Sequence, residues 1–280
     1  MTPQRFSRSI EDYPDGIVLP IDKPYRWTSA DVIRKVKYAA IKHFGKKNLK
    51  VGHAGTLDPL ATGILLVCIG PATKRAEELQ RSPKQYIAGV TFGATTPSYD
   101  LEKEIDAEFP LDGVSEQSVR DLLPRFIGEQ EQVAPLFSAK SVDGVRAYEM
   151  ARRMYREAQR NGSVFDHADA ELLSRQMINI YGLELLDFAD RRGTGIPPRN
   201  PSPPSKSDRI HVADISSYAL PTATIRVDCS KGTYIRALAR DLGEALGSGA
   251  FLSSLRRTGN GGFSIEDALS LEDVLALLAE

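Results

Sequence analysis

A short stretch with three glycines, GHAGTLDPLATG at residues 52–63, has the residue types of a reactive loop. Glycine at this density indicates tight turns or close approach of other backbone. Pro59 disfavours the helical conformation at the residue before it, so we expect Asp58 in a turn or an extended segment. An apolar run follows at once and would anchor the loop on the core. A carboxylate held by stiff backbone beside a dry core could act as a nucleophile or a base, although Asp58 could instead cap a following helix.

A second stretch, SKGTYIR at residues 230–236, places a basic residue next to a turn. The pattern predicts that a strand ends, Gly232 turns the chain and a helix begins. The N-terminus of a helix carries a positive partial charge and attracts anions. Arg236, in the first turn of this helix, is therefore placed against the local field. A carboxylate partner such as Asp58 would compensate for that, and the alternative is an arginine that points into solvent.

The elements that must position these two stretches follow from the periodicity of the apolar residues. Runs with strand character are found at 16–21, 86–92, 178–189 and 222–229. Helical periods are found at 28–44, 122–127, 145–160, 235–246 and 270–280. Strands and helices do not alternate in the strict order of a doubly wound sheet, so a mixed α+β sheet fits better.

The helix expected at 28–44 begins with a capping signal and continues into a basic run. Thr28 and Asp31 have the spacing of a capping box. Residues 34–50 contain seven Lys or Arg and no Asp or Glu. A run of this kind is either a solvated helix face or a surface that faces phosphate groups, and the sequence leaves both interpretations open.

The composition sets limits on the class of protein. Apolar residues make up 41% of the chain, enough to bury a core, and the formal net charge of −1 argues mildly against a nucleic-acid binder. Cys68 and Cys229 are too few for a disulfide framework or a four-cysteine zinc site, so we expect both in the core. No signal-peptide core and no run long enough to cross a bilayer is found. We therefore expect a cytoplasmic protein that does not bind membranes.

Motifs of common cofactor sites are missing from the sequence. It contains neither a G-x-x-x-x-G-K-[ST] phosphate loop nor a G-x-G-x-x-G dinucleotide turn. The four histidines form no tight cluster, so His53 and Asp58 are not expected to bind a metal. We therefore expect no cofactor.

Six segments together resemble the TruB family of tRNA pseudouridine synthases. They occur in the family's order and span nearly the whole chain: DKPYRWTSADVIRKVK (22–37), GHAGTLDPLATGILLV (52–67), KQYIAGVTFG (84–93), SAKSVDGVRAYEMAR (138–152), SKGTYIRALARDLGEALG (230–247) and LRRTGNGGFSIEDA (255–268). The resemblance implies the pseudouridine synthase fold, an α+β fold whose mixed, mostly antiparallel central sheet is flanked by helices. It also implies isomerisation of uridine 55 in the T-loop of tRNA. Dyskerin-type RNA pseudouridine synthases share this core and are the alternative.

The resemblance also assigns site residues by position. As catalytic residues it implies Asp58, Arg236 and Tyr86, and as substrate-binding residues His53, Tyr234, Leu255 and Lys23. Asp58 would be the catalytic aspartate, Tyr86 would stack on the target base, and His53 would lie beside the flipped nucleotide. Arg236 would pair with Asp58.

The same resemblance implies the organisation of the chain and its partners. Residues 1–280 would form one catalytic domain without the C-terminal PUA domain of many family members, and the segment at about 140–176 would be a mobile loop that grips RNA. Residues 190–209, with five prolines, are expected to be a disordered insertion. The partner would be the T-stem-loop of tRNA, bound by a monomer without an obligatory protein partner.

The chemistry of pseudouridine formation agrees with an aspartate as the central residue. Asp58 could attack C1′, remove a proton at C2′ or add to C6 of the base, and the sequence leaves these three open. Each needs the ionised carboxylate, which a nearby Arg236 would favour. The uracil must leave the stacked loop, and Tyr86 offers an aromatic face to receive it. A non-catalytic RNA-binding or tRNA-folding module and a small-molecule glycosidase are the other interpretations.

Overall fold

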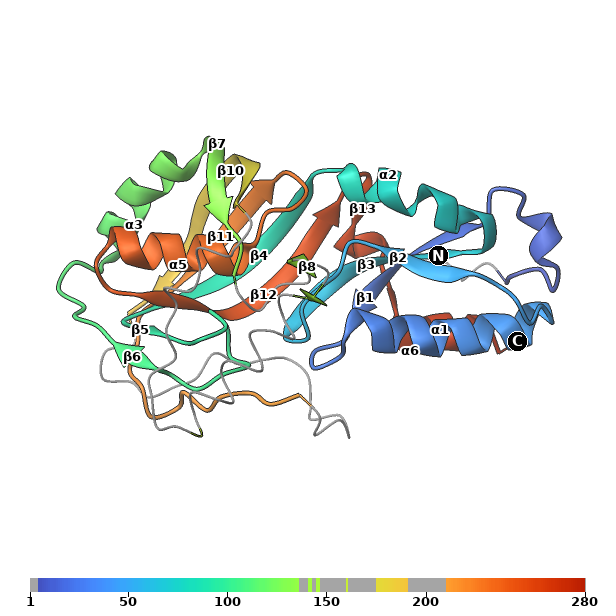
Figure 1. Cartoon of the computed structure of the whole chain (residues 1–280), viewed down its shortest axis with the longest axis horizontal. Coiled ribbons are helices and arrows are strands. Elements are labelled where there is room, and N and C mark those ends of the chain that lie inside the picture. Colours follow the sequence, from blue (N-terminus) through green and yellow to red (C-terminus); the bar gives the residue numbers. More distant parts are fainter. Residues whose placement is uncertain are drawn as a thin grey trace. The chain divides into compact units, whose positions relative to one another are not determined.

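The computed structural model describes residues 5–135, 141–142, 145–146, 160, 175–190 and 210–279. The chain forms two compact units. The first comprises Met1–Tyr86, Pro201–Ile210 and Leu255–Glu280, and the second comprises Ile87–Asn200 and His211–Ser254. Strands β4 (Lys84–Phe92) and β12 (Ala250–Asn260) contribute residues to both units. The fold is α+β with mixed, mostly antiparallel strand pairing, as predicted (Figure 1).

The first unit is built around strand β3. Its strands are β1 (Ile17–Lys23), β2 (Val51–Ala54), β3 (Ala61–Ile69), β13 (Phe263–Ser264), β14 (Leu269–Ser270) and part of β12. β1 runs antiparallel along one edge of β3. The other edge is shared, because residues 61–63 pair in parallel with β12 and residues 66–69 pair antiparallel with β2. This sharing brings β12 close to the loop that connects β2 to β3.

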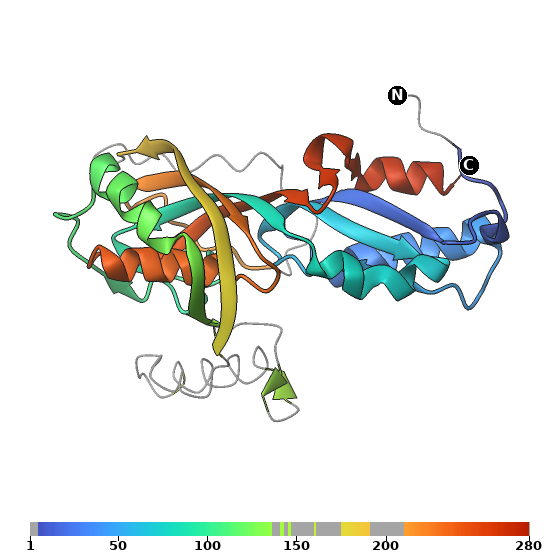
Figure 2. The same cartoon turned by 90° about the horizontal axis from the view of Figure 1, so that it is seen from above.

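Helices cover both faces of this sheet. Helices α1 (Ser29–Phe44) and α6 (Leu271–Leu277) contact each other, and α2 (Ala76–Arg81) contacts β2. In Figure 2, α2 lies in front of these strands and α1 behind them. Ile64 and Leu66 pack with Ala54 beneath α2. β3 is buried along almost its whole length, as the apolar run after the glycine-rich stretch predicts.

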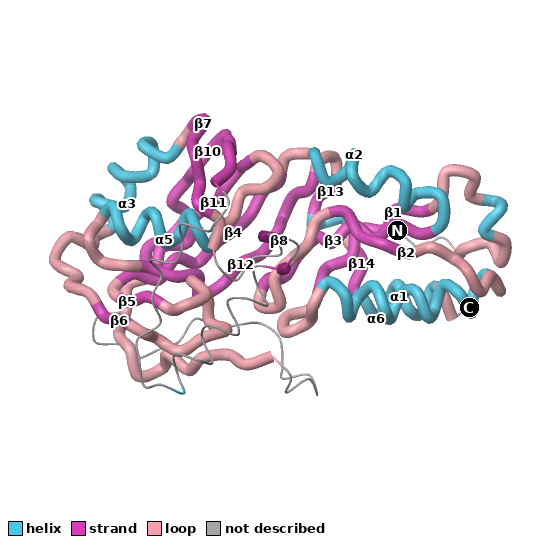
Figure 3. Tube along the Cα trace, viewed as in Figure 1, coloured by secondary structure: helices cyan, strands magenta, loops and turns pink. Residues whose placement is uncertain are grey.

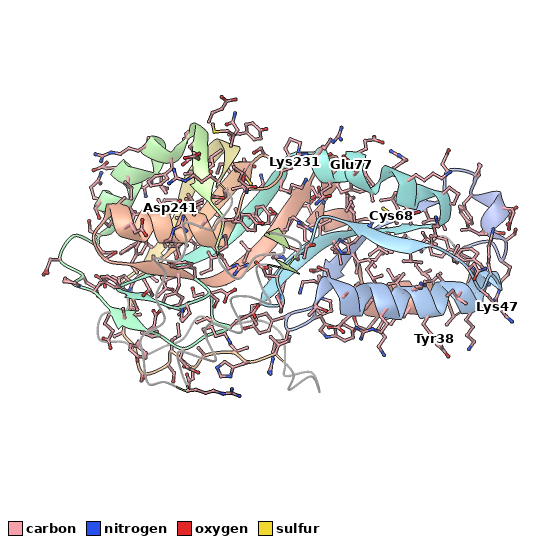
Figure 4. All side chains as sticks on the ribbon, in the orientation of Figure 1. Tyr38, Lys47, Cys68, Glu77, Lys231 and Asp241 are labelled. Carbon is pink, nitrogen blue, oxygen red and sulfur yellow. The ribbon has the colours of Figure 1, made fainter. Side chains whose placement is uncertain are left out.

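Helix α1 confirms the capping signal. Thr28 Oγ1 accepts a hydrogen bond from Asp31 N at 3.0 Å, and Thr28 N donates to Asp31 Oδ2 at 3.2 Å. The helix ends at Gly45, whose φ of +63° is unstrained only for glycine. The basic side chains of α1 are exposed, and Tyr38 between them is 76% exposed. Figure 4 shows Tyr38 and Lys47 on the outer surface of this unit.

The second unit places a helix against antiparallel strands. β4, β11 (Thr222–Cys229), β10 (Arg175–Ala189) and β7 (Gly128–Val133) lie side by side in that order, and β10 runs antiparallel to both β11 and β7. Helix α5 (Ile235–Ala245) follows β11 and buries its apolar face, Ile235, Leu238, Ala239 and Leu242. Short strands β5 (Ala94–Thr95) and β6 (Ala107–Glu108) form a separate pair.

The predicted strands and the main helices are confirmed, with two corrections. The helix expected at 122–127 begins earlier, as α3 (Glu116–Leu122), and continues as a 3-10 turn, η3 (Leu123–Phe126). Ser115 caps α3, and Pro124 cannot donate a helical hydrogen bond, so the α-helix ends before it. Residues 145–146 form β9 (Val145–Arg146), paired with β8 (Ser141–Val142), rather than the start of a helix.

Several expectations fall where the structure gives no description. Most of the expected helix at 145–160, most of the RNA-gripping segment at 140–176 and most of the insertion at 190–209 lie outside the described residues. Among the described residues, no helix is long and apolar enough to span a membrane.

Candidate active site

Asp58 lies in the loop between β2 and β3, residues 55–60, drawn as a loop in Figure 3. Its side chain is half-buried, and its backbone carbonyl accepts a hydrogen bond from Ala61 N at 3.1 Å. The residue is in neither a helix nor a strand, as Pro59 predicts. The next element is β3, so Asp58 does not cap a helix.

Three buried side chains from different elements hold the backbone on both sides of Asp58. The first is Ser29, at the start of α1. Its hydroxyl donates to Leu57 O and accepts from Leu57 N, both at 3.0 Å. The peptide unit directly before Asp58 is thereby fixed to the N-terminus of a helix.

The second is Lys23, at the end of β1, whose side chain is 0% exposed. Its ammonium donates to the carbonyl oxygens of Pro24 at 3.0 Å, Trp27 at 2.5 Å and Pro59 at 3.2 Å. Burial lowers the pKa of Lys23 to about 7, and the negative charge of Asp58 is the strongest effect in the opposite direction. Lys23 therefore binds the carbonyl of the residue directly after Asp58 and lies within electrostatic reach of the carboxylate.

The third is Arg257 on β12, which is 1% exposed. Its Nε donates to Ile64 O at 2.7 Å, Nη2 to Gly55 O at 3.0 Å and Nη1 to Thr56 O at 3.5 Å. The sequence gives no role to this residue, which the motif shows only as the second of two arginines after Leu255. The sequence cannot indicate this role, because Arg257 and Gly55 are 202 residues apart in the chain.

Gly63 makes this arrangement possible. Its φ is +97°, and an added Cβ would lie 2.1 Å from the carbonyl oxygen of Arg257. A glycine at this position lets the backbone of β12 approach β3 closely enough to place Arg257 under the loop.

His53 lies on β2, two residues before the loop, and is half-buried. Burial lowers the pKa of His53, and the positive charge of Arg257 lowers it further. Its Nδ1 is buried and has no hydrogen-bond partner among the described residues. Because this nitrogen is covered by protein atoms, a polar contact through it would require the ring or its neighbours to shift.

The other predicted site residues of the first unit lie on its strands. Tyr86 is on β4 and is 8% exposed. Leu255 is half-buried on β12, opposite Ala61 in the parallel register with β3. The first unit thus contains Asp58, Lys23, His53, Tyr86 and Leu255.

Arg236 and Tyr234 belong to the second unit. Arg236 is 4% exposed in the first turn of α5, where its Nε lies 3.7 Å from Asp100 Oδ2 and its Nη1 donates to Ser98 O at 3.0 Å. Asp100 supplies a carboxylate of the kind expected for this arginine, and the sequence does not single it out. The backbone of Tyr234 is bound by the side-chain amide of Gln132 at both its N–H and its carbonyl. The pairing of Arg236 with Asp58 stays a prediction, because the two residues belong to different units.

Two family models match the chain. The N-terminal domain of TruB family pseudouridylate synthases matches residues 41–194, and the C-terminal domain of tRNA pseudouridylate synthase B matches residues 236–280. The chain belongs to the TruB family. The first match contains the loop with Asp58, and the second contains Arg236 and all of β12 with Arg257.

Relatives of similar length support the TruB assignment. A protein called tRNA pseudouridine synthase B from Phocaeicola vulgatus is 46% identical over 93% of this chain and 92% of its own length. Proteins of the same name from Bacteroides thetaiotaomicron and Flavobacterium johnsoniae are 45% and 40% identical, over 93% of this chain in both cases and over 92% and 95% of their own lengths.

Solved structures show a similar fold for more distant proteins. A chain in the crystal structure of a Cbf5–Nop10–Gar1 complex aligns with a TM-score of 0.59 and 24% identity. The alignment covers 99% of this chain and 60% of that chain, so the TruB protein spans about 60% of the length of this neighbour. At this identity the likeness extends to the fold alone.

Proposed function

We propose that this TruB-family protein isomerises a uridine of tRNA, uridine 55 in the T-loop, to pseudouridine, with Asp58 as the catalytic residue. The observation that carries the proposal is the half-buried carboxylate of Asp58 on a loop whose flanking peptides are bound by Ser29, Lys23 and Arg257. A group held in this way needs little reorganisation in the transition state. The names of relatives at 40–46% identity support tRNA as the substrate.

The reaction that we propose breaks the N1–C1′ bond of uridine and forms a C5–C1′ bond. C5 loses its proton and N1 gains one, so nothing is oxidised and no energy donor is needed. Asp58 takes part as attacking nucleophile at C1′, as base at C2′ or by addition to C6, and all three routes use the ionised carboxylate. The three routes share the requirement that the base leave its stack.

The remaining predicted residues would receive the flipped nucleotide. We propose that Tyr86 stacks on the uracil and that His53 contacts the T-loop of the tRNA through its imidazole. Leu255 and Tyr234 would complete the walls of the pocket. Arg236 would pair with Asp58 and keep it ionised. Lys23, whose amine is bound to three carbonyls, is better placed to hold the loop than to contact RNA directly.

A tritium-release assay tests this function against the alternatives. A T-arm transcript carrying 5-³H-uridine is incubated with the protein, and both tritium release and nucleoside composition are measured. Pseudouridine synthesis releases tritium and retains every base. A glycosidase would release free uracil, and an RNA-binding module would bind the transcript without change. A dyskerin-type enzyme would modify the transcript only with a guide RNA present.

We further propose that the protein acts as a monomer, without an obligatory protein partner, in the cytoplasm.

We expect binding of tRNA to depend on the basic run that includes α1. Neutralising Lys35, Lys37, Lys46 and Lys47 to glutamine should weaken binding and flatten the plot of log affinity against log salt by about 0.7–0.9 for each phosphate that is no longer neutralised. All four side chains are exposed, so the melting temperature should change little. A control replaces Arg120 and Arg175 with glutamine; both are exposed, lie outside the basic run and are paired with glutamates at 2.7 and 2.8 Å, as Lys46 is with Glu11. Salt-independent affinity in the wild type would contradict this interface.

We expect turnover to survive exhaustive chelation and to need no nucleoside triphosphate. The isomerisation requires neither, and among the described residues no group of three His, Cys, Asp or Glu side chains could hold a metal ion. The measurement is the rate with EDTA-treated enzyme and a substrate refolded beforehand. An activity that is lost on chelation and restored only by zinc would overturn the mechanism, whereas modest stimulation by magnesium reflects the folding of tRNA.

A further inference from the structure

Arg257 connects the two ends of the chain segment that contains Asp58. Its guanidinium contacts the carbonyls of Gly55 and Thr56, where the loop leaves β2, and the carbonyl of Ile64, where β3 is already established. Asp58 lies between these two anchor points in the chain. One side chain thus ties the beginning of the loop to the strand that follows it.

Burying the charged side chain of Arg257 costs free energy, so its position in the core needs an explanation. A guanidinium that is 1% exposed has lost its hydration, and the described part of the chain offers it carbonyl oxygens but no carboxylate within ion-pair distance. Its positive charge nonetheless acts on the pKa of neighbouring groups. Arg257 and Asp58 both act on the pKa of Lys23, in opposite directions, so the three charges form one cluster.

We propose that Arg257 is a positioning residue for the reaction: it fixes the loop so that the Asp58 carboxylate is held in the orientation that reacts with the flipped uridine. This inference rests on the proposed function. Arg257 acts through the backbone and touches no substrate. A structural filler at this position would only stabilise the fold, whereas a positioning residue sets the orientation of Asp58 in a protein that is already folded.

Arginine is suited to this task in a way that lysine is not. Its planar fork directs Nε and both Nη groups at fixed angles, so that three carbonyls from two chain segments are bound at once. One ammonium can also bind several carbonyls, as Lys23 does, but all its donors lie on a single nitrogen. A lysine at position 257 would keep the charge, and we expect it to bind Ile64 O or Gly55 O but not both, which would leave the loop attached at one end.

The first test is the single-turnover rate of Arg257→Met and Arg257→Lys. We expect the rate of Arg257→Met to fall roughly 10²-fold, the cost of misplacing a reacting group by about 1 Å, while the Kd for tRNA changes little. Arg257→Lys should recover part of the lost rate. The matched control is Arg256→Met, on the same strand, whose side chain is 41% exposed and binds Asp22 at 2.7 Å. It should turn over at nearly the wild-type rate.

The second test needs no turnover. Because the charge of Arg257 lowers the pKa of His53, the NMR titration of His53 should shift to higher pH in Arg257→Met and stay in place in Arg256→Met. In Arg257→Ala, guanidinium added well below denaturing concentrations should restore both the rate and the titration. If Arg257→Met folds poorly, Arg257→Lys, which keeps the charge and most of the volume, provides the rate comparison.

Near-wild-type turnover by folded Arg257→Met would overturn the proposal, as would a rate loss that simply follows the unfolded fraction measured by circular dichroism. An unmoved His53 titration would equally contradict the geometry. If the wild-type protein forms no pseudouridine, the proposed function fails instead, and the His53 titration still reports whether the charge of Arg257 lies close to β2, where the loop begins.

Discussion

Replacing Asp58 with asparagine is expected to abolish most of the catalysis while leaving tRNA binding nearly unchanged. Asparagine keeps the size and most of the hydrogen-bonding shape of aspartate but carries no negative charge. If the carboxylate acts as nucleophile or base, the single-turnover rate should fall on the order of 10⁴-fold, or roughly 5.5 kcal/mol of transition-state stabilisation. A lost hydrogen bond, at about 0.5–1.5 kcal/mol, is too weak to explain such a loss.

The same preparation of Asp58→Asn separates catalysis from structure. Its melting temperature and its Kd for tRNA should match those of Asp267→Asn, a control that removes an exposed carboxylate of the same unit. A purely structural role predicts the reverse, a lower melting temperature with normal turnover in the folded fraction. Normal turnover by Asp58→Asn would mean that another residue does the chemistry.

Replacing Lys23 with methionine is expected to give the largest loss of stability. Methionine fills a similar volume but leaves the carbonyls of Pro24, Trp27 and Pro59 without their donor. Each unsatisfied buried group costs about 1–3 kcal/mol, which is offset in part because the buried charge is removed as well. We expect a net loss of about 2–4 kcal/mol at neutral pH, measured by urea unfolding.

The pH dependence distinguishes this effect from ordinary cavity formation. The pKa of Lys23 is about 7 in the folded protein against an ordinary 10.5, so between these values the unfolded chain binds the extra proton. The contribution of Lys23 to stability therefore rises as pH increases from 7 to 10.5, by up to about 5 kcal/mol, and is flat below that window. Lys23→Met should lack this rise.

Lys84 provides a comparison for the Lys23 variant. It is also a buried lysine whose amine donates to backbone carbonyls, those of Gln80 and Ser82. Lys84→Met therefore reports the general cost of removing a buried lysine from this unit. If the stability difference between wild type and Lys23→Met is the same at pH 7 and pH 10, the assignment of the pH dependence to Lys23 is wrong.

Local features of the sequence determined the elements and the identity of the reactive loop. The capping box of Thr28 and Asp31 acts over three residues, and the effect of Pro59 on Asp58 acts over one, so both can be recognised without a fold. The apolar run after the loop likewise indicates a segment anchored in the core, which the structure shows to be strand β3. The resemblance carried by the six motifs then indicated the family, which the family models and the relatives confirm.

Tertiary structure alone decided how the reactive loop is held. Ser29, Lys23 and Arg257 reach it across 28, 36 and 202 residues, and Arg236 meets Asp100 across 136. No periodicity or spacing encodes such pairs. The contacts of Arg257, for example, arise only when β12 pairs with β3 beside β2. The physical reason is that a buried ammonium or guanidinium must find several acceptors at once, and only the packed fold brings carbonyls from distant segments to one point.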